Sequence, residues 1–181
     1  MFFYNLFIFV SIRDKSYLYY IFYIFTFSLF QLTQNGLAYE FLNPVISNTH
    51  YIPQIGSILM LTSVFFAESF LNLKVNLPRY HKLYPAMKML LLLSMVSPYA
   101  LKYSYSVLFY IFTTILTIIL IYSSGVICAF KKYRPAIFYT IAWTFVLFGG
   151  VVYAMKVLAI VPNNYFTSYA IQVGSALEVM L

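Results

Sequence analysis

The feature that most limits the fold of this chain is a series of apolar runs, separated by short basic clusters. A helix needs about 20 apolar residues to cross a hydrocarbon core roughly 30 Å thick. Apolar residues make up 63% of the chain and charged residues only 8%, compared with about 25% in soluble domains. We therefore expect an all-α membrane protein. Its net charge of +7 is divided among the connections between runs, so we expect lipid and not nucleic acid as its surroundings.

Seven runs are expected to cross the membrane as a helix bundle. The first would rise only about 18 Å and the last about 25 Å, so we expect both to be truncated, as in an excerpt or a shortened gene product. The fourth run contains Lys88, near enough to one end to reach the interface, and Pro98, which should kink it. The expected spans are residues 1–12, 17–38, 54–73, 83–101, 107–130, 136–155 and 165–181, in a single domain.

The connections predict the orientation of this bundle. Those after the first, third and fifth runs hold eight Lys or Arg residues, whereas the other three hold only Lys102 and Lys156. Basic residues are retained on the cytoplasmic side, so the N-terminus should lie outside and the C-terminus inside. The residues that determine this topology are Arg13, Lys15, Lys74, Arg79, Lys82, Lys131, Lys132 and Arg134.

Patterns that carry catalysis or bind metal are missing from the sequence. It has no HExxH, CxxC, GxSxG or glycine-rich phosphate loop. His50 and His81 fall in connections on opposite sides of the membrane, and we expect both to be solvated. Cys128 is the single cysteine, which excludes a disulfide within the chain. We therefore expect no enzymatic activity, metal or cofactor.

Polar residues near or inside the spans are the remaining candidates. Asp14 is expected to cap the second helix with Ser16. Glu68 lies near the cytoplasmic end of its span, where it should reach the headgroups or pair with a basic residue of the connection. Glu178 lies deeper, and structural and functional roles are equally supported there.

Small and amide side chains favour helix packing over ligand contact. Gln31 and Asn35 share one helix face, and Gln172, Ser175 and Glu178 form a second polar stripe beside Gly174. Gly149 and Gly150 are either a close-packing point or a flexible joint.

Several blocks of the chain resemble, in order, the bacterial seven-transmembrane receptor family with diverse intracellular signalling modules. They are residues 5–9, 11–20, 31–38, 67–74, 133–136 and 172–179. Glu68 departs from the family pattern, which favours a basic or neutral residue there, so no role is carried over to it. The resemblance adds Asn5 and Gly36 to the candidates for packing or signal transmission, which are Asn5, Gln31, Asn35, Gly36, Gln172, Gly174, Ser175 and Glu178.

The resemblance implies a sensor in the bacterial cytoplasmic membrane. Members of the family carry an extracytoplasmic β-rich domain, and a coiled-coil linker leads to an output module; neither lies within these residues. A stimulus would shift the last helix and so pass a signal to an output module, which is fused or separate. Gln172 and Glu178 lie on this helix and should report its movement. A following coiled coil would also favour a homodimer. The alternatives are a small transporter or channel subunit, or a stand-alone, degenerate scaffold. The sequence shows no internal repeat of the kind that many transporters have.

Overall fold

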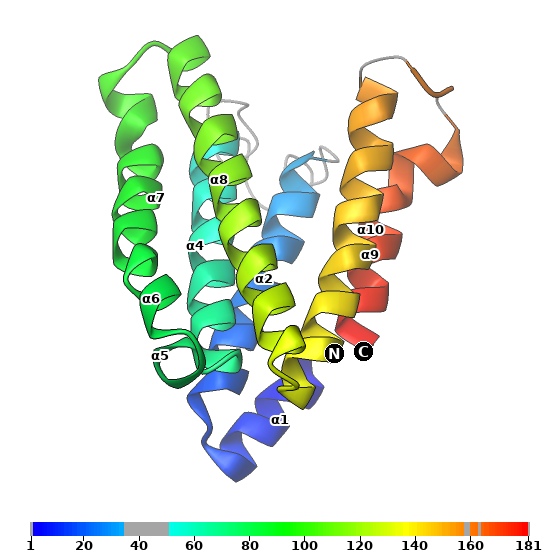
Figure 1. The fold of residues 1–181 in the computed structure, drawn as a ribbon. Coiled ribbons are helices and arrows are strands. Elements are labelled where there is room, and N and C mark those ends of the chain that lie inside the picture. The colour runs from blue at the N-terminus through cyan, green and yellow to red at the C-terminus, as the bar shows by residue number, and fades with distance from the viewer. Residues whose placement is uncertain (1, 35–50, 158–159, 163, 181) are drawn as a thin grey trace. The chain divides into compact units, whose positions relative to one another are not determined.

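A computed structural model describes residues 2–34, 51–157, 160–162 and 164–180, and all the regular structure within these ranges is helical. The all-α class is therefore confirmed. Figure 1 shows the helices in order along the chain. They are α1 (Phe2–Ile12), α2 (Lys15–Gln34), α4 (Ile52–Phe70), α5 (Leu73–Asn76), α6 (Pro78–His81), α7 (Leu83–Ala100), α8 (Tyr103–Phe130), α9 (Arg134–Val157) and α10 (Tyr165–Met180).

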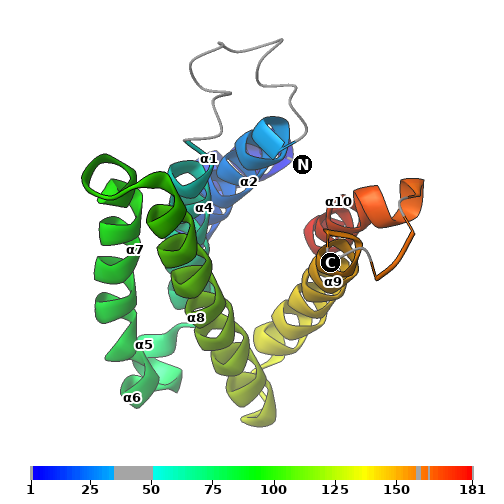
Figure 2. The ribbon, with the colours of Figure 1, turned by 90° about the horizontal axis from the view of Figure 1, so that it is seen from above.

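The chain forms two compact units, Met1–Ile121 and Tyr122–Leu181. In the first unit, α1 packs on α2, α2 on α4, and α4 on α7, and the first part of α8 belongs to the same unit. In the second unit, α9 and α10 pack along each other (Figures 1 and 2). Because α8 is one helix, it contributes residues to both units.

Where the structure describes them, the helix ends lie within four residues of the expected span ends; residues 1, 35–38 and 181 of those spans lie outside the described residues. α7 covers the fourth run and continues through Pro98 to Ala100. Proline has no N–H to donate to the carbonyl four residues earlier, and here that Ser94 carbonyl accepts the Ser97 hydroxyl at 2.8 Å. Within the described residues, the helices long and apolar enough to cross a membrane are α4, α8 and the Arg134–Val152 part of α9. The full set of seven crossings stays a prediction.

Each of the three connections that hold the basic residues contains one residue in the left-handed backbone conformation. Arg13, Asn72 and Lys132 each adopt a positive φ, of 55°, 46° and 61°, one or two residues after the end of a helix. This left-handed conformation terminates helices by letting later amides bond the last carbonyls. After α8, for example, the Lys132 amide bonds the Ala129 carbonyl and the Tyr133 amide bonds the Cys128 carbonyl. The left-handed residue therefore ends each of these three helices sharply.

Asp14 starts α2 as expected. Its carboxylate accepts the Ser16 amide at 2.9 Å, which satisfies an N–H that has no partner within the helix. The Ser16 hydroxyl in turn hydrogen-bonds the Ser69 hydroxyl at 3.0 Å. The start of α2 therefore lies beside the end of α4, and the helices run antiparallel. This places Arg13 and Lys15 at the same end of the first unit as the connection that follows α4.

Aromatic rings fill the interface between α2 and α4. The Tyr19 and Phe65 rings stack with centroids 5.7 Å apart, and Tyr23 and Phe66 stack at 6.0 Å. Further along, the hydroxyls of Thr26 and Thr62 bond each other at 2.9 Å. These contacts fix both the rotation and the register of the two helices, because rings and hydroxyls interact only over a narrow range of geometry.

Candidate functional site

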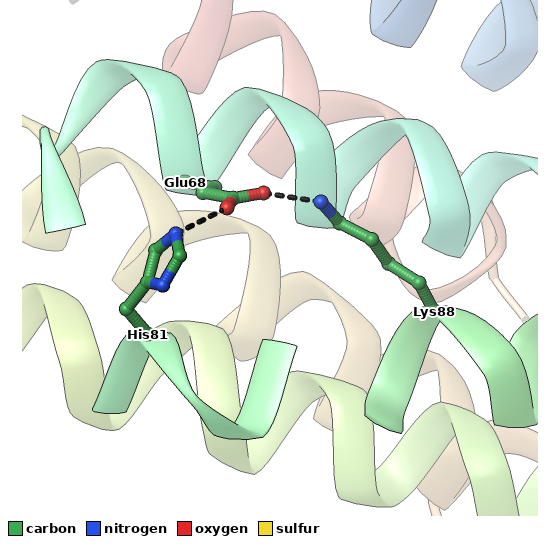
Figure 3. A network of polar contacts seen from close by, with 3 residues as sticks. All are labelled: Glu68, His81 and Lys88. Carbon is green, nitrogen blue, oxygen red and sulfur yellow. Dashed lines mark hydrogen bonds and ion pairs between the residues drawn. The ribbon is translucent and has the colours of Figure 1, made fainter. Parts of the chain in front are cut away.

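The most concentrated charge within the first unit is a cluster of Glu68, His81 and Lys88, shown in Figure 3 and called the Glu68 cluster below. Glu68 comes from the last turns of α4, His81 from the end of α6, and Lys88 from the second turn of α7. One carboxylate oxygen lies 2.9 Å from the His81 Nε2, and the other accepts a hydrogen bond from the Lys88 ammonium. One acidic side chain therefore links three helices.

The Glu68 cluster is partly shielded from solvent. Its side chains are 22% (Glu68), 31% (His81) and 21% (Lys88) exposed, and the Lys88 ammonium also lies 4.1 Å from the centre of the Phe65 ring. A charge in such a place needs a partner, because its lost hydration is not otherwise replaced. The Glu68 and Lys88 charges cancel, and His81 adds a positive charge only when it is protonated.

His81 was expected to be a solvated residue of the connection, but its imidazole contacts Glu68 and is only 31% exposed. The left-handed turn at Asn72 and the two short helices α5 and α6 return the chain over the end of α4, so the imidazole reaches Glu68. Glu68 was expected to reach the headgroups or to pair with a basic residue of the connection, and the residue of the connection that it contacts is His81. Lys88 points to the same carboxylate, although we expected it to reach the interface.

A spacing in the sequence could have revealed this cluster. Glu68 precedes Lys74 by six residues, and Lys88 follows Lys82 by six. In two antiparallel helices joined by a short connection, positions equally far from that connection lie at similar depth. Opposite charges at matched depth then predict an ion pair.

A second polar group, of Ser57, Ser94 and Thr113, lies at the meeting of α4, α7 and α8 within the first unit, and we call it the hydroxyl cluster. The Ser57 and Ser94 hydroxyls bond at 2.9 Å, and Thr113 donates to Ser94 at 3.4 Å. All are at most 1% exposed. Ser57 and Thr113 also lie within bonding distance of a carbonyl of their own helix, Pro53 at 2.7 Å and Tyr110 at 2.9 Å. The Ser57 and Thr113 hydroxyls can thus bond within their own helices or across to Ser94.

A close approach of α8 to α4 lies one residue away from the hydroxyl cluster. A Cβ at Gly56 would collide with the ring and hydroxyl of Tyr110. The missing side chain therefore lets the aromatic ring of α8 lie directly on α4.

Within the second unit, α9 and α10 approach each other closely enough for their backbones to touch. A Cβ at Gly174 in α10 would lie 2.5 Å from the Phe145 carbonyl oxygen of α9, a distance that real contacts do not reach. The predicted close approach at Gly174 is therefore confirmed. Among the described residues, a Cβ at Gly150 would meet nothing within 4 Å, so no close approach is seen there.

The other predicted residues are distributed over both units. Ser175 is buried and donates to the Gln172 carbonyl at 2.9 Å, while the Gln172 side chain is half-buried. Asn5 is buried on α1, and the Gln31 Nε2 on α2 has no hydrogen-bond partner within the described residues. Asn35 and Gly36 lie outside the described residues, as does the side chain of Glu178. All eight residues predicted to set the topology are exposed: Arg13, Lys15, Lys74, Arg79, Lys82, Lys131, Lys132 and Arg134.

Across the part of the chain that the structure describes, no three His, Cys, Asp or Glu side chains come together as a metal ion would require.

Comparison with known proteins decides the family. The family model described as 7TM diverse intracellular signalling matches residues 1–181. The chain belongs to this family. No curated protein and no solved structure matches it. Family membership and the helices able to span a bilayer together identify a membrane protein of the 7TM diverse intracellular signalling family.

Proposed function

We propose that residues 1–181 are the transmembrane sensing and signal-transmission module of a bacterial receptor. As one seven-span domain of the cytoplasmic membrane, it would couple an extracytoplasmic or in-membrane stimulus to a cytoplasmic output module, fused or separate. The match of the family model to residues 1–181 is the observation that carries this proposal. The module itself would catalyse no reaction, and a homodimer is the assembly that would follow from a coiled-coil linker.

The arrangement of the first unit supports the proposed orientation, with the N-terminus outside and the C-terminus in the cytoplasm. Arg13 and Lys15 share an end of this unit with Lys74, Arg79 and Lys82, because Ser16 bonds Ser69 across α2 and α4. The positive-inside rule assigns such an end to the cytoplasm.

The contact between α9 and α10 supports a role of α10 in transmission. At the contact described between them, a glycine lies against a backbone carbonyl, and such a contact depends on closeness and not on the direction of a bond. A stimulus that favours one of two packings would move α10 along α9, and the movement would pass to whatever follows α10. Gln172 and Glu178 lie on this helix, where a shift would change their surroundings.

A small transporter or channel subunit is the second candidate, and the Glu68 cluster is the observation that favours it. Charged residues in membrane helices often mark an ion or substrate path. However, this cluster lies beside the connection between α4 and α7, whereas transporter sites lie near the middle of the bilayer. The receptor is therefore preferred.

The experiment for this proposal uses the receptor as the cell makes it, with its output module. Gln172→Leu and Glu178→Gln are expected to change basal or stimulated output while the amount of protein in the membrane stays normal. Ser28→Ala is the matched control, because its exposed hydroxyl bonds only the Ile24 carbonyl of its own helix among the contacts described. Unchanged output in both variants, at normal membrane levels, would contradict transmission through α10.

A further inference from the structure

The connection between α4 and α7 carries more positive charge than the Glu68 cluster uses. Lys74 on α5, Arg79 on α6 and Lys82 directly after α6 are all exposed. None of the three forms an ion pair with a described carboxylate. The carboxylates whose side chains the structure describes are Asp14, which accepts the Ser16 amide, and Glu68, which already contacts His81 and Lys88. The charge of these three residues is therefore available to an external anion.

The same segment is held on the body of the first unit and shows apolar side chains on its outside. Leu73 and Leu77 are buried, and the Asn76 side chain donates to the Leu71 carbonyl at 2.7 Å. Val75 and Leu83, by contrast, are 71% and 52% exposed. The short helices are thus anchored by buried residues and carry basic side chains beside exposed apolar ones. This combination is typical of a segment that lies in the membrane interface.

We propose that Lys74, Arg79 and Lys82, with Val75 and Leu83 beside them, form a surface that binds the phosphate groups of anionic phospholipids. The ammonium and guanidinium groups would contact the headgroup phosphates, and the two apolar side chains would enter the acyl boundary. Charge complementarity favours lipid as the partner. The surface offers cations beside exposed apolar side chains, and an anionic bilayer offers headgroup phosphates beside acyl chains. The proposal rests on the membrane location of the chain and not on its signalling role.

This surface would also act on the Glu68 cluster. His81 is the last residue of α6, between Arg79 and Lys82, and its imidazole contacts Glu68. Lipid bound on the outside of α6 would therefore hold His81 over the end of α4.

The experiment measures lipid preference in nanodiscs, which have the same composition in both leaflets and so make the result independent of orientation. The full chain is placed in phosphatidylcholine with increasing phosphatidylglycerol, and enrichment of the anionic lipid at the protein is measured by native mass spectrometry. The triple variant Lys74→Gln/Arg79→Gln/Lys82→Gln is compared with Lys131→Gln/Lys132→Gln/Arg134→Gln, which removes the same charge from another exposed connection. Far-UV circular dichroism verifies that both variants are folded, and a Lys74→Arg/Lys82→Arg variant preserves the charge.

The wild type and the Arg variant are expected to enrich phosphatidylglycerol. At low salt the first triple variant should lose about fivefold in preference for each cation removed, with a smaller loss in the second triple variant. Equal losses in both triple variants would overturn the proposal, because the effect would then be general to basic connections. Loss of enrichment on adding millimolar inorganic phosphate would also overturn it, in favour of a free-phosphate site. Absence of enrichment in the wild type, with binding of an acidic peptide instead, would assign the surface to a protein partner. Normal lipid binding with unchanged output in the α10 variants would contradict only the proposed function.

Discussion

The two units of this molecule hold their helices together by different means. In the first unit, α2, α4 and α7 are joined by side chains: stacked rings, paired hydroxyls and the Glu68 cluster. In the second unit, α9 and α10 meet where a glycine lies against a carbonyl of the neighbouring helix. Both are known ways to associate helices where lipid removes the hydrophobic driving force between them.

This difference indicates which helices can slide past each other at a lower cost in free energy. Hydrogen bonds and ion pairs are directional, so sliding α4 against α2 or α7 would break several of them together. Contact through small residues depends on closeness more than on direction, and a helix can shift along such a surface to another close packing. On this argument the first unit is a frame and the α9–α10 pair is the adjustable element.

The largest expected effect comes from adding one methyl group at Gly174. Gly174→Ala places a Cβ 2.5 Å from the Phe145 oxygen, and a backbone atom cannot move aside as a side chain can. We expect a loss of about 1–3 kcal/mol in the free energy of unfolding. We also expect a longer distance between spin labels at the exposed positions Phe148 and Val173, in a Cys128→Ala background.

Gly150→Ala is the matched control, because its Cβ meets open space and Ala is the better helix former by roughly 0.5–1 kcal/mol. Similar stability in both variants would remove the proposed distinction between the units.

Removing the central charge of the Glu68 cluster should have the next largest effect. Glu68→Gln leaves Lys88 in a partly shielded place without its counter-charge. Because the side chains keep some exposure, we expect a loss of about 1–2 kcal/mol in the free energy of unfolding, below the cost of breaking a fully buried pair. The measurement is unfolding in mixed micelles at increasing SDS, followed by circular dichroism.

A double-mutant cycle with Lys88→Met isolates the interaction of the pair from other effects of each substitution. If the two changes were additive, the ion pair would contribute nothing, and α4 and α7 would be held by packing alone.

Much of the first unit could be predicted from the sequence, and so could the contact between α9 and α10 at Gly174. Periodic apolar runs gave the helices, Asp14 the start of α2, and Gly174 the close approach, because each acts through local geometry or residue size. The Glu68 cluster was missed because the matched spacing of Glu68 and Lys88 around their connection was not used. The hydroxyl cluster was missed because its members come from different helices, and which of their side chains meet depends on how each helix is rotated about its axis. Ser94 and Thr113 look like any other hydroxyl residue in an apolar run, since such residues usually bond their own helix.

A smaller effect is expected at the centre of the hydroxyl cluster. Ser94→Ala removes the contacts with both Ser57 and Thr113, and these hydroxyls then return to carbonyls of their own helices. Bonds between membrane helices average about 0.6 kcal/mol, so we expect a loss of about 1 kcal/mol. Ser28→Ala should change stability by much less. A loss no larger than the control would mean that α4, α7 and α8 do not depend on these bonds.

The smallest effect should come from the hydroxyl pair between α2 and α4. Thr26 bonds Thr62, but its hydroxyl also lies 2.9 Å from the Phe22 carbonyl, so a bond within the helix replaces much of what is lost. A cycle of Thr26→Val and Thr62→Val should therefore give a coupling of only about 0.6 kcal/mol. Thr33→Val tests a hydroxyl that is equally buried on the same helix and bonds the Leu29 carbonyl, and it should show no coupling to Thr62. If Thr26 and Thr62 showed none either, the stacked rings alone would set the register of α2 on α4, and the frame would depend on aromatic packing and charge.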